Sequence, residues 1–157
     1  MKKLKLYLDT SIISHAIDDR DPETKRLTLQ LFKEIKAGEY EAFVSELVMA
    51  EINKADEVTR QKLIKQIKDI DPEGVDLSRE VKALADRYIK QGIIPEKYKD
   101  DATHIAAATV NEMDMIVSWN FEHIVKAKTI REVTAINLLM GYRGLEIYSP
   151  LEVVKNV

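Results

Sequence analysis

Short apolar runs alternate with helical patterns along the chain, and this alternation is the strongest constraint on its fold. Strands are expected at about residues 4–8, 41–45 and 115–118, with a short edge strand at 75–77 and a last strand at 145–148. Amphipathic helical patterns separate these runs. Because each strand is followed by a helix, the sequence predicts a parallel sheet with right-handed crossovers, and therefore an α/β fold.

Helix signals between the strands support this interpretation. Pro22 suits the first turn of a helix that runs to about Lys36, which Gly38 can close, and Ser78 can cap a later helix. Thr10 can cap the helix that begins at Ser11, and a short turn of helix is expected after Asn120. No internal repeat, low-complexity segment or linker interrupts the pattern. We therefore expect a single domain over residues 1–157, long enough to bury a sizeable core. Further helices are expected at about 47–54, 57–70, 99–112 and 129–140.

Composition excludes several classes of protein. The chain has no cysteine, so it has neither a disulfide framework nor a thiolate metal site. No apolar run has the length of a membrane span, and the first residues lack the apolar region of a secretory signal, so a cytoplasmic protein is expected. The net charge of −3 gives no global attraction for nucleic acid. Any polyanionic substrate must therefore meet a local basic patch or a bound metal ion.

Acidic and amide side chains occur close to the ends of the expected strands. Asp9 directly follows the first strand, Glu51 lies just beyond the second, and Asn120 lies just past the third core strand. Asp100 and Asp101 open a helix. Because the carboxyl ends of parallel strands and the starts of adjoining helices share one edge of a sheet, we expect these side chains to share one crevice.

Each of these residues also has a purely structural explanation. Asp9 and Asn120 can cap helices, the two adjacent aspartates complement a helix dipole, and Glu51 can be a partly exposed helix residue. Their joint occurrence favours a site, because crowded like charges require a cation or a proton. Hard oxygen ligands suit Mg²⁺ or Mn²⁺. Zinc is disfavoured, since neither His104 nor His123 has a histidine or cysteine partner at a ligand spacing. His104 is expected to be hydrogen-bonded or partly exposed, and His123 is able to contact substrate.

Four motifs, in this order, resemble those of PIN domains, and in particular the VapC-like toxins of toxin–antitoxin pairs. The resemblance covers residues 4 to about 153. Each motif alone is weak, and the four together are specific. They are Leu-Asp-Thr-Ser at 8–11, Ser-Glu-Leu-Val-Met-Ala-Glu-Ile at 45–52, Asp-Ala-Thr-His-Ile-Ala-Ala-Ala at 101–108 and Ile-Val-Ser-Trp-Asn-Phe at 116–121.

This resemblance implies a three-layer α/β/α fold and a Mg²⁺-dependent ribonuclease. Metal-activated water would hydrolyse RNA phosphodiesters and leave 5′-phosphate and 3′-hydroxyl ends. Homodimerisation and inhibition by a small antitoxin are also implied. The implied metal positions are Asp9, Glu51 and Asp101, with Asn120 at the fourth acidic position and Ser11 and Ser118 at small polar positions that line the site.

Asn120 departs from the family pattern, which frequently has an aspartate there. A neutral amide adds no charge for a second metal ion, and a PIN-like module that binds RNA or a protein without cutting it is the alternative. An aspartyl phosphatase fits less well, because Ser11 stands where a second acid is wanted. A receiver domain is also disfavoured, because Asn120 follows the late strand where a lysine is wanted.

Two groups of basic residues are expected at the rim of the crevice, one just before the acidic helix and one after the Asn120 turn. Both are candidates to contact the RNA backbone, and a solvated surface explains each equally well. Trp119, beside a core strand, is expected to pack rather than to stack on a base. The basic residues are Lys97, Lys99, Lys126, Lys128 and Arg131.

Helix geometry separates the two adjacent aspartates. Successive helical residues turn by about 100°, so Asp101 lies roughly 40° from the direction of Ile105, and Asp100 about 140° from it. Asp101 should therefore lean toward the sheet and Asp9, whereas Asp100, on the side of His104 and Asn111, should face outward or cap the helix. The expected buried stripe is Ala102, Ile105, Ala106, Thr109 and Met113.

Overall fold

Five parallel strands form the central sheet of the computed structural model, which describes residues 2–155. Their order is β3-β2-β1-β4-β5, so the first strand of the chain lies at the centre. All four neighbouring pairs are parallel, which confirms the predicted sheet. The strands are β1 (Leu4–Leu8), β2 (Tyr40–Ser45), β3 (Glu73–Val75), β4 (Met115–Val117) and β5 (Glu146–Tyr148).

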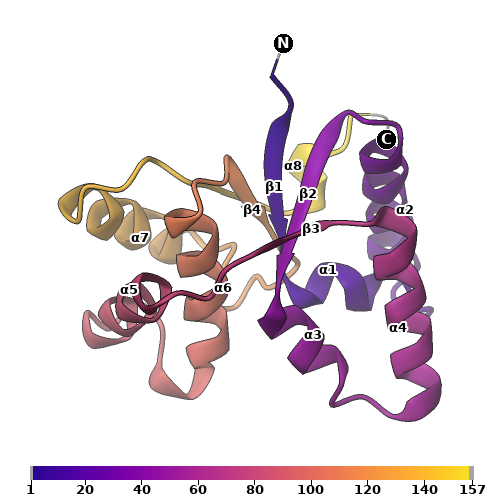
Figure 1. Ribbon diagram of the computed structural model, residues 1–157, viewed down its shortest axis with the longest axis horizontal. Coiled ribbons are helices and arrows are strands. Elements are labelled where there is room, and N and C mark those ends of the chain that lie inside the picture. Colours follow the sequence, from indigo (N-terminus) through magenta and orange to yellow (C-terminus); the bar gives the residue numbers. More distant parts are fainter. Residues whose placement is uncertain (1, 156–157) are drawn as a thin grey trace.

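Helices cover both faces of this sheet, which gives three layers (Figure 1). The short 3₁₀ helix η1 (Glu96–Tyr98) leads into α6. One face carries α1 (Thr10–His15), α2 (Pro22–Lys36), α3 (Glu46–Ile52), α4 (Glu57–Ile70) and α8 (Pro150–Val153), and the other carries α5 (Arg79–Lys90), α6 (Lys99–Val110) and α7 (Ala127–Leu139). No helix among residues 2–155 is long and apolar enough to cross a membrane.

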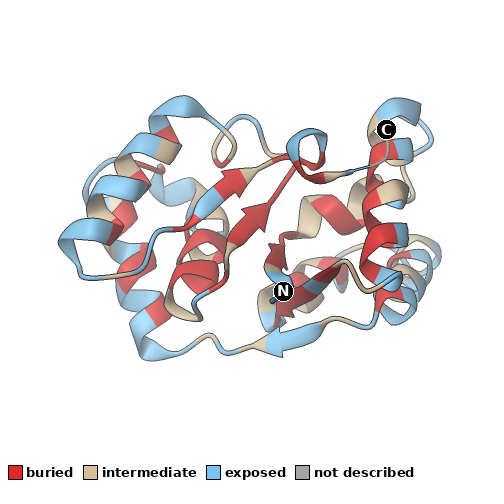
Figure 2. Cartoon of the chain, turned by 90° about the horizontal axis from the view of Figure 1, so that it is seen from above, coloured by how far each residue is buried: buried red, intermediate tan, exposed pale blue. Residues whose placement is uncertain are grey.

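Side-chain alternation along β1 explains why both faces are covered. Leu6 and Leu8 pack into the core under α1 to α4, whereas Tyr7 between them packs into the core under α5 to α7. All three are fully buried. A parallel strand that is apolar on both faces needs a helix layer on each. In Figure 2 the strands are accordingly buried, while the outer faces of the helices are exposed.

Local signals set most helix boundaries as predicted, with two differences. Ser78 accepts a hydrogen bond from Val81 N and caps α5. At the start of α1, however, Asp9 is the N-cap and Thr10 is already helical, so the expectation that Thr10 caps this helix is wrong. The residues after Asn120 form a hydrogen-bonded turn rather than a helical turn.

Helix α6 is buried on more sides than an amphipathic pattern predicts. Asp100 is exposed, as the helix register requires, but His104 is only 2% exposed. The expectation that His104 shares the outward side of Asp100 is therefore wrong, because its imidazole is directed at Tyr7 of β1 and Glu51 of α3. The predicted stripe of Ala102, Ile105, Ala106, Thr109 and Met113 is buried throughout.

A buried polar contact ties the three helices of the second face together. Tyr88 of α5 donates its hydroxyl hydrogen to Asn137 Oδ1 of α7, and Asn137 Nδ2 donates to Thr109 Oγ1 of α6 at 3.2 Å. Thr109 in turn donates to Ile105 O. Each group has a partner, so the polar contact fixes the helix arrangement without leaving an unsatisfied donor in the core.

Replacing Asn137 with leucine should lower the free energy of unfolding by about 1–3 kcal/mol, because the buried Tyr88 hydroxyl loses its acceptor. Adding Tyr88→Phe to Asn137→Leu should recover most of this loss, since removing both partners of a buried hydrogen bond is nearly neutral. Urea unfolding followed by circular dichroism measures both variants. A double variant less stable than Asn137→Leu alone would contradict this account.

Candidate active site

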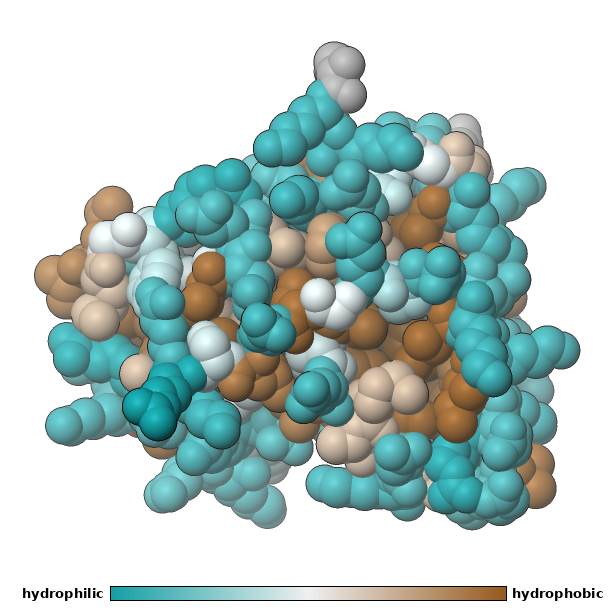
Figure 3. Space-filling view, in the orientation of Figure 1, coloured by the Kyte–Doolittle hydropathy of each residue, from teal (hydrophilic) through white to brown (hydrophobic). Residues whose placement is uncertain are grey.

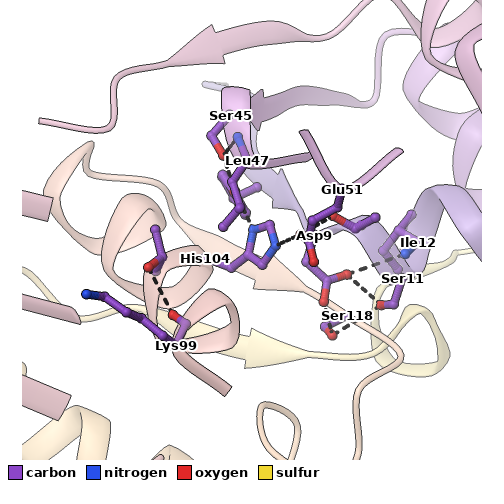
Figure 4. A network of polar contacts seen from close by, with 12 residues as sticks. Asp9, Ser11, Ile12, Ser45, Leu47, Glu51, Lys99, His104 and Ser118 are labelled. Carbon is purple, nitrogen blue, oxygen red and sulfur yellow. Dashed lines mark hydrogen bonds and ion pairs between the residues drawn. The ribbon is translucent and has the colours of Figure 1, made fainter. Parts of the chain in front are cut away.

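Polar side chains from four separate elements meet at the carboxyl-terminal edge of the sheet. Asp9 follows β1, Ser118 follows β4, Glu51 lies in α3, and His104 reaches in from α6 (Figure 4). The structure thus brings the first and third core strands together with two helices, as the position of polar residues at strand ends predicts.

Asp9 is a buried carboxylate with both oxygens engaged. Asp9 as a whole residue is only 3% exposed to solvent. Ser11 Oγ donates to Oδ1 and Ser118 Oγ donates to Oδ2, each at 2.6 Å. Burial raises the pKa of Asp9, and the two hydroxyls and the nearby His104 offset this only in part. An ionised Asp9 therefore carries a charge that its surroundings do not fully compensate.

The two serines also hold the loop that follows β4. Trp119 N donates to Ser11 Oγ and Asn120 N donates to Ser118 Oγ, both at 2.9 Å. The hydroxyls that bind Asp9 are thereby oriented by the backbone of the neighbouring strand's loop. Ser11 and Ser118 thus lie at the site, beside the buried carboxylate.

Glu51 projects from the last turn of α3 into the same site. Its Oε1 accepts hydrogen bonds from Thr10 Oγ1 and His104 Nε2, both at 2.7 Å. Burial acts to raise the pKa of Glu51, but the bonds from His104 and Thr10 outweigh it, and the pKa is lowered. The pKa of Glu51 therefore moves in the opposite direction to that of Asp9.

Asp101 is half-buried at the opening of α6 and contacts two residues that follow β4. His123 Nδ1 lies 3.2 Å from Asp101 Oδ2, and the Asn120 side chain is hydrogen-bonded to Asp101. Burial and the charge of Asp9 raise the pKa of Asp101 more than His123, His104 and Asn120 lower it. Asn120 Oδ1 also accepts from His123 N at 2.9 Å, so Asn120 both holds its turn and reaches the site.

The basic residues differ in how they are placed. Lys97 Nζ lies 5.7 Å from the centroid of the Tyr98 ring, and Tyr98 stacks on His123 at 3.8 Å between ring centroids. Lys99 Nζ is 3.4 Å from Asp86, so its charge is shared with α5. Each is an exposed side chain, and their contact with RNA stays a prediction.

The second basic group follows a tight turn. Val125 N donates to Asn120 O at 2.8 Å, which folds the segment back and places Lys126 directly after the site loop. Lys128 Nζ is paired with Glu132 at 3.0 Å in the first turns of α7, and Arg131 is exposed. Of these three residues, Lys126 is nearest to Asn120 in the sequence and directly follows this turn.

Two aromatic residues of the site loop differ sharply in exposure. Trp119 is 7% exposed and its indole Nε1 donates to Thr28 Oγ1 at 2.8 Å, so it packs as expected. Phe121 is 51% exposed and touches Trp119 edge-on, with 6.1 Å between ring centroids. Sequence reasoning missed Phe121, although an aromatic residue directly after the site asparagine was the available signal.

The oxygen donors at this site are of the kind that Mg²⁺ prefers, although the carboxylates do not form a compact cluster. Among residues 2–155, no group of three or more histidine, aspartate or glutamate side chains forms a ready metal-binding cluster. Mg²⁺ needs only one or two direct carboxylates and keeps several waters. Asp9 and Asp101 are two oxygen donors of this kind, and that they bind a metal ion stays a prediction.

Comparisons with known proteins bear on the fold. No protein-family model matches the chain, and no curated protein matches it. The structure is similar to a chain of VapBC2 from Rickettsia felis, whose crystal structure was determined bound to a DNA fragment from the promoter. The sequence identity is 15%, the TM-score is 0.57, and the match covers 93% of this chain and 98% of that chain. The likeness confirms a PIN-like, three-layer α/β/α fold.

Replacing Asp9 with asparagine should raise the free energy of unfolding at neutral pH in metal-free protein. The folded state holds the pKa of Asp9 above its unfolded value of 3.8. Stability that is present below pH 3.8 is therefore lost as the pH rises through the folded pKa, and the neutral amide escapes this loss. Urea unfolding at a series of pH values in excess chelator measures the difference.

The matched control is Asp100→Asn, which replaces an exposed aspartate on the same sheet edge. We expect its stability to follow the wild type at every pH. A stability gain for Asp9→Asn that did not grow with pH would contradict the assignment of a costly ionised Asp9. Added Mg²⁺ should stabilise the wild type more than Asp9→Asn, since binding to the folded state stabilises it.

Proposed function

We propose that this protein is a Mg²⁺-dependent ribonuclease and the toxin of a toxin–antitoxin pair. The observation that carries the proposal is the position of Asp9, Glu51, Asp101 and Asn120 along one edge of the sheet, close enough for the charge of Asp9 to act on Asp101. Burial raises the pKa of two of these carboxylates, Asp9 and Asp101, so their ionised forms are stabilised by a cation. A divalent cation and a phosphate backbone are complementary to such a site.

Asp9 and Asp101 would hold the metal ion directly, and Glu51 would act directly or through a water molecule. Bound there, Mg²⁺ would activate water and offset the charge of the phosphate oxygens. The protein's other residues orient the carboxylates that would bind the metal ion. Ser11 and Ser118 orient Asp9, and Asn120 orients Asp101 through its side-chain contact.

Single-stranded RNA is the substrate that the surroundings favour. Lys126 follows the site loop and supplies positive charge for a phosphate. The half-exposed ring of Phe121 is held by Trp119, which is itself fixed to Thr28, so it presents a rigid face on which a base can stack. Surfaces that bind single strands typically combine positive charge with exposed aromatic rings, and this loop carries one residue of each kind.

An antitoxin partner and a homodimer belong to the same proposal. Support for the antitoxin comes from the similar structure, which is a VapBC2 complex. The exposed apolar residues at the end of α7, Leu138 and Leu139, are available for contact with another chain. Size-exclusion chromatography with light scattering would test the dimer.

The alternative is a PIN-like module that binds RNA or a protein without cutting it. The neutral Asn120 favours this alternative, because it removes a charge that many family members have. Asp9, Glu51 and Asp101 argue against it, since a binding module gains nothing from one buried and one half-buried carboxylate, Asp9 and Asp101, whose ionisation is unfavourable. Turnover in the presence of metal separates the two functions.

Replacing Asp101 with asparagine should lower the initial rate of RNA cleavage to about a hundredth or less, because a metal-binding charge is lost. Asp100→Asn is the matched control, one residue away but exposed, and should keep a substantial part of the rate. The measurement is cleavage of single-stranded RNA at saturating Mg²⁺, with excess chelator as the blank. A folded Asp101→Asn protein as active as the wild type would overturn the site assignment.

Two substitutions on the site loop should affect RNA binding in different ways. Lys126→Ala should flatten the dependence of log affinity on log salt by about 0.7, the contribution of one phosphate contact to a single strand. Phe121→Ala should cost about 1–3 kcal/mol of binding free energy and leave the slope unchanged, because stacking carries no charge. Fluorescence anisotropy in excess chelator measures both without cleavage.

Lys68→Ala serves as the control, because this exposed lysine lies on the solvated outer face of α4. It should change neither the affinity nor the slope. If Lys126→Ala and Lys68→Ala gave the same small effect, Lys126 would be ordinary surface charge. If Phe121→Ala bound RNA as tightly as the wild type, the ring would have no part in binding a base.

A further inference from the structure

We infer that His104 is a positioning residue that fixes the orientation of the Glu51 carboxylate at the site. The inference rests on the proposed function, and it assigns a role to a buried side chain that neither the metal nor the substrate contacts require. His104 Nε2 lies 2.7 Å from Glu51 Oε1. Figure 4 shows the imidazole of α6 directed at Glu51, beside Asp9.

Glu51 is held at one oxygen only. Thr10 Oγ1 and His104 Nε2 both donate to Oε1, at 2.7 Å each, from α1 and α6. Among residues 2–155, these are the two hydrogen bonds that the Glu51 side chain makes, and neither involves Oε2. Two donors on one oxygen define the plane of the carboxylate, so Oε2 has a fixed direction.

The other nitrogen of the His104 imidazole also has a hydrogen-bond partner. Tyr7 OH lies 2.7 Å from His104 Nδ1, and Ser45 Oγ lies 2.8 Å from Tyr7 OH. Ser45 also accepts from Leu47 N and caps α3, the helix that carries Glu51. The series of contacts therefore begins at Ser45, the N-cap of α3, and returns to the last turn of this helix through β1 and α6.

The solvent exposure of the residues in this series of contacts rises only at its last member, Glu51. Tyr7 is fully buried, Ser45 and His104 are each 2% exposed, and only the Glu51 side chain, 26% exposed, reaches solvent. A purely structural contact would have no need to end at a solvent-accessible carboxylate. Each buried polar group of this network has a hydrogen-bond partner. The network therefore holds the Glu51 carboxylate in one orientation.

Two substitutions of nearly equal size separate the two ends of the imidazole. His104→Gln places an amide Nε2 where the imidazole Nε2 lies, so it keeps a donor for Glu51 and loses the contact with Tyr7. His104→Asn places its amide near the Nδ1 position, so it keeps a partner for Tyr7 and is too short to reach Glu51. Comparing the two variants therefore separates the loss of the Glu51 contact from a general effect on folding.

We expect His104→Asn to lower kcat about 10- to 100-fold, the usual effect of losing a group that orients a metal-site carboxylate. Its KM for RNA should stay within about twofold, since His104 touches no substrate, and kcat of His104→Gln should lie well above that of His104→Asn. Equal kcat values for the two folded variants, or losses that follow their melting temperatures, would overturn the inference.

A second measurement uses metal-free protein without RNA. In long-range ¹H–¹⁵N spectra of histidine-labelled protein, Glu51→Ala should shift the Nε2 signal of His104 and leave that of His15 in place. An unmoved His104 signal would overturn the contact itself. If the wild type cleaved no RNA with any metal, the proposed function would fail, while these spectra would still decide whether His104 holds Glu51.

Discussion

The burial of one carboxylate, Asp9, is the constraint on which the site depends. Removing an ionised group from water is costly unless hydrogen bonds and opposite charge compensate it. Here two serine hydroxyls supply the bonds, and the same hydroxyls accept from the backbone of the loop after β4. The end of the central strand, the start of α1 and this loop are therefore assembled around a single charge, which makes the geometry of the site inseparable from the fold.

The three carboxylates are not equivalent, and histidines explain the difference. His104 donates to Glu51 and, with Thr10, overcomes the effect of burial, so the pKa of Glu51 is lowered. His123 lies beside Asp101, but burial and the charge of Asp9 prevail there, and the pKa of Asp101 is raised. The ionised form of one carboxylate is thus favoured by its hydrogen bonds, whereas burial disfavours the ionised form of the other two.

Sequence periodicity was sufficient for the layers and for the residues at strand ends, because both depend on local patterns. The alternation of Leu6 and Leu8 with Tyr7 and the position of Asp9 are examples. The role of His104 was not predictable in this way. Its partners Tyr7 and Glu51 are 97 and 53 residues distant in the sequence, and the helix period marks one buried face of α6 without revealing that α5 encloses another. The same limit applies to the edge strand β3, expected at 75–77 and found at Glu73–Val75, where only three residues pair and the pattern is short.

Asn120 shows how a departure from a family pattern can fit its surroundings. Its Oδ1 accepts from His123 N and holds the turn, a role that an aspartate oxygen would fill equally well. The difference lies at Asp101, which the Asn120 side chain also contacts. An aspartate there would face Asp101 with a like charge and would raise a pKa that burial and Asp9 have already raised. The amide instead donates to that carboxylate, so it keeps the turn, favours the ionised form of Asp101, and places one charge fewer at an edge where ionisation is already unfavourable.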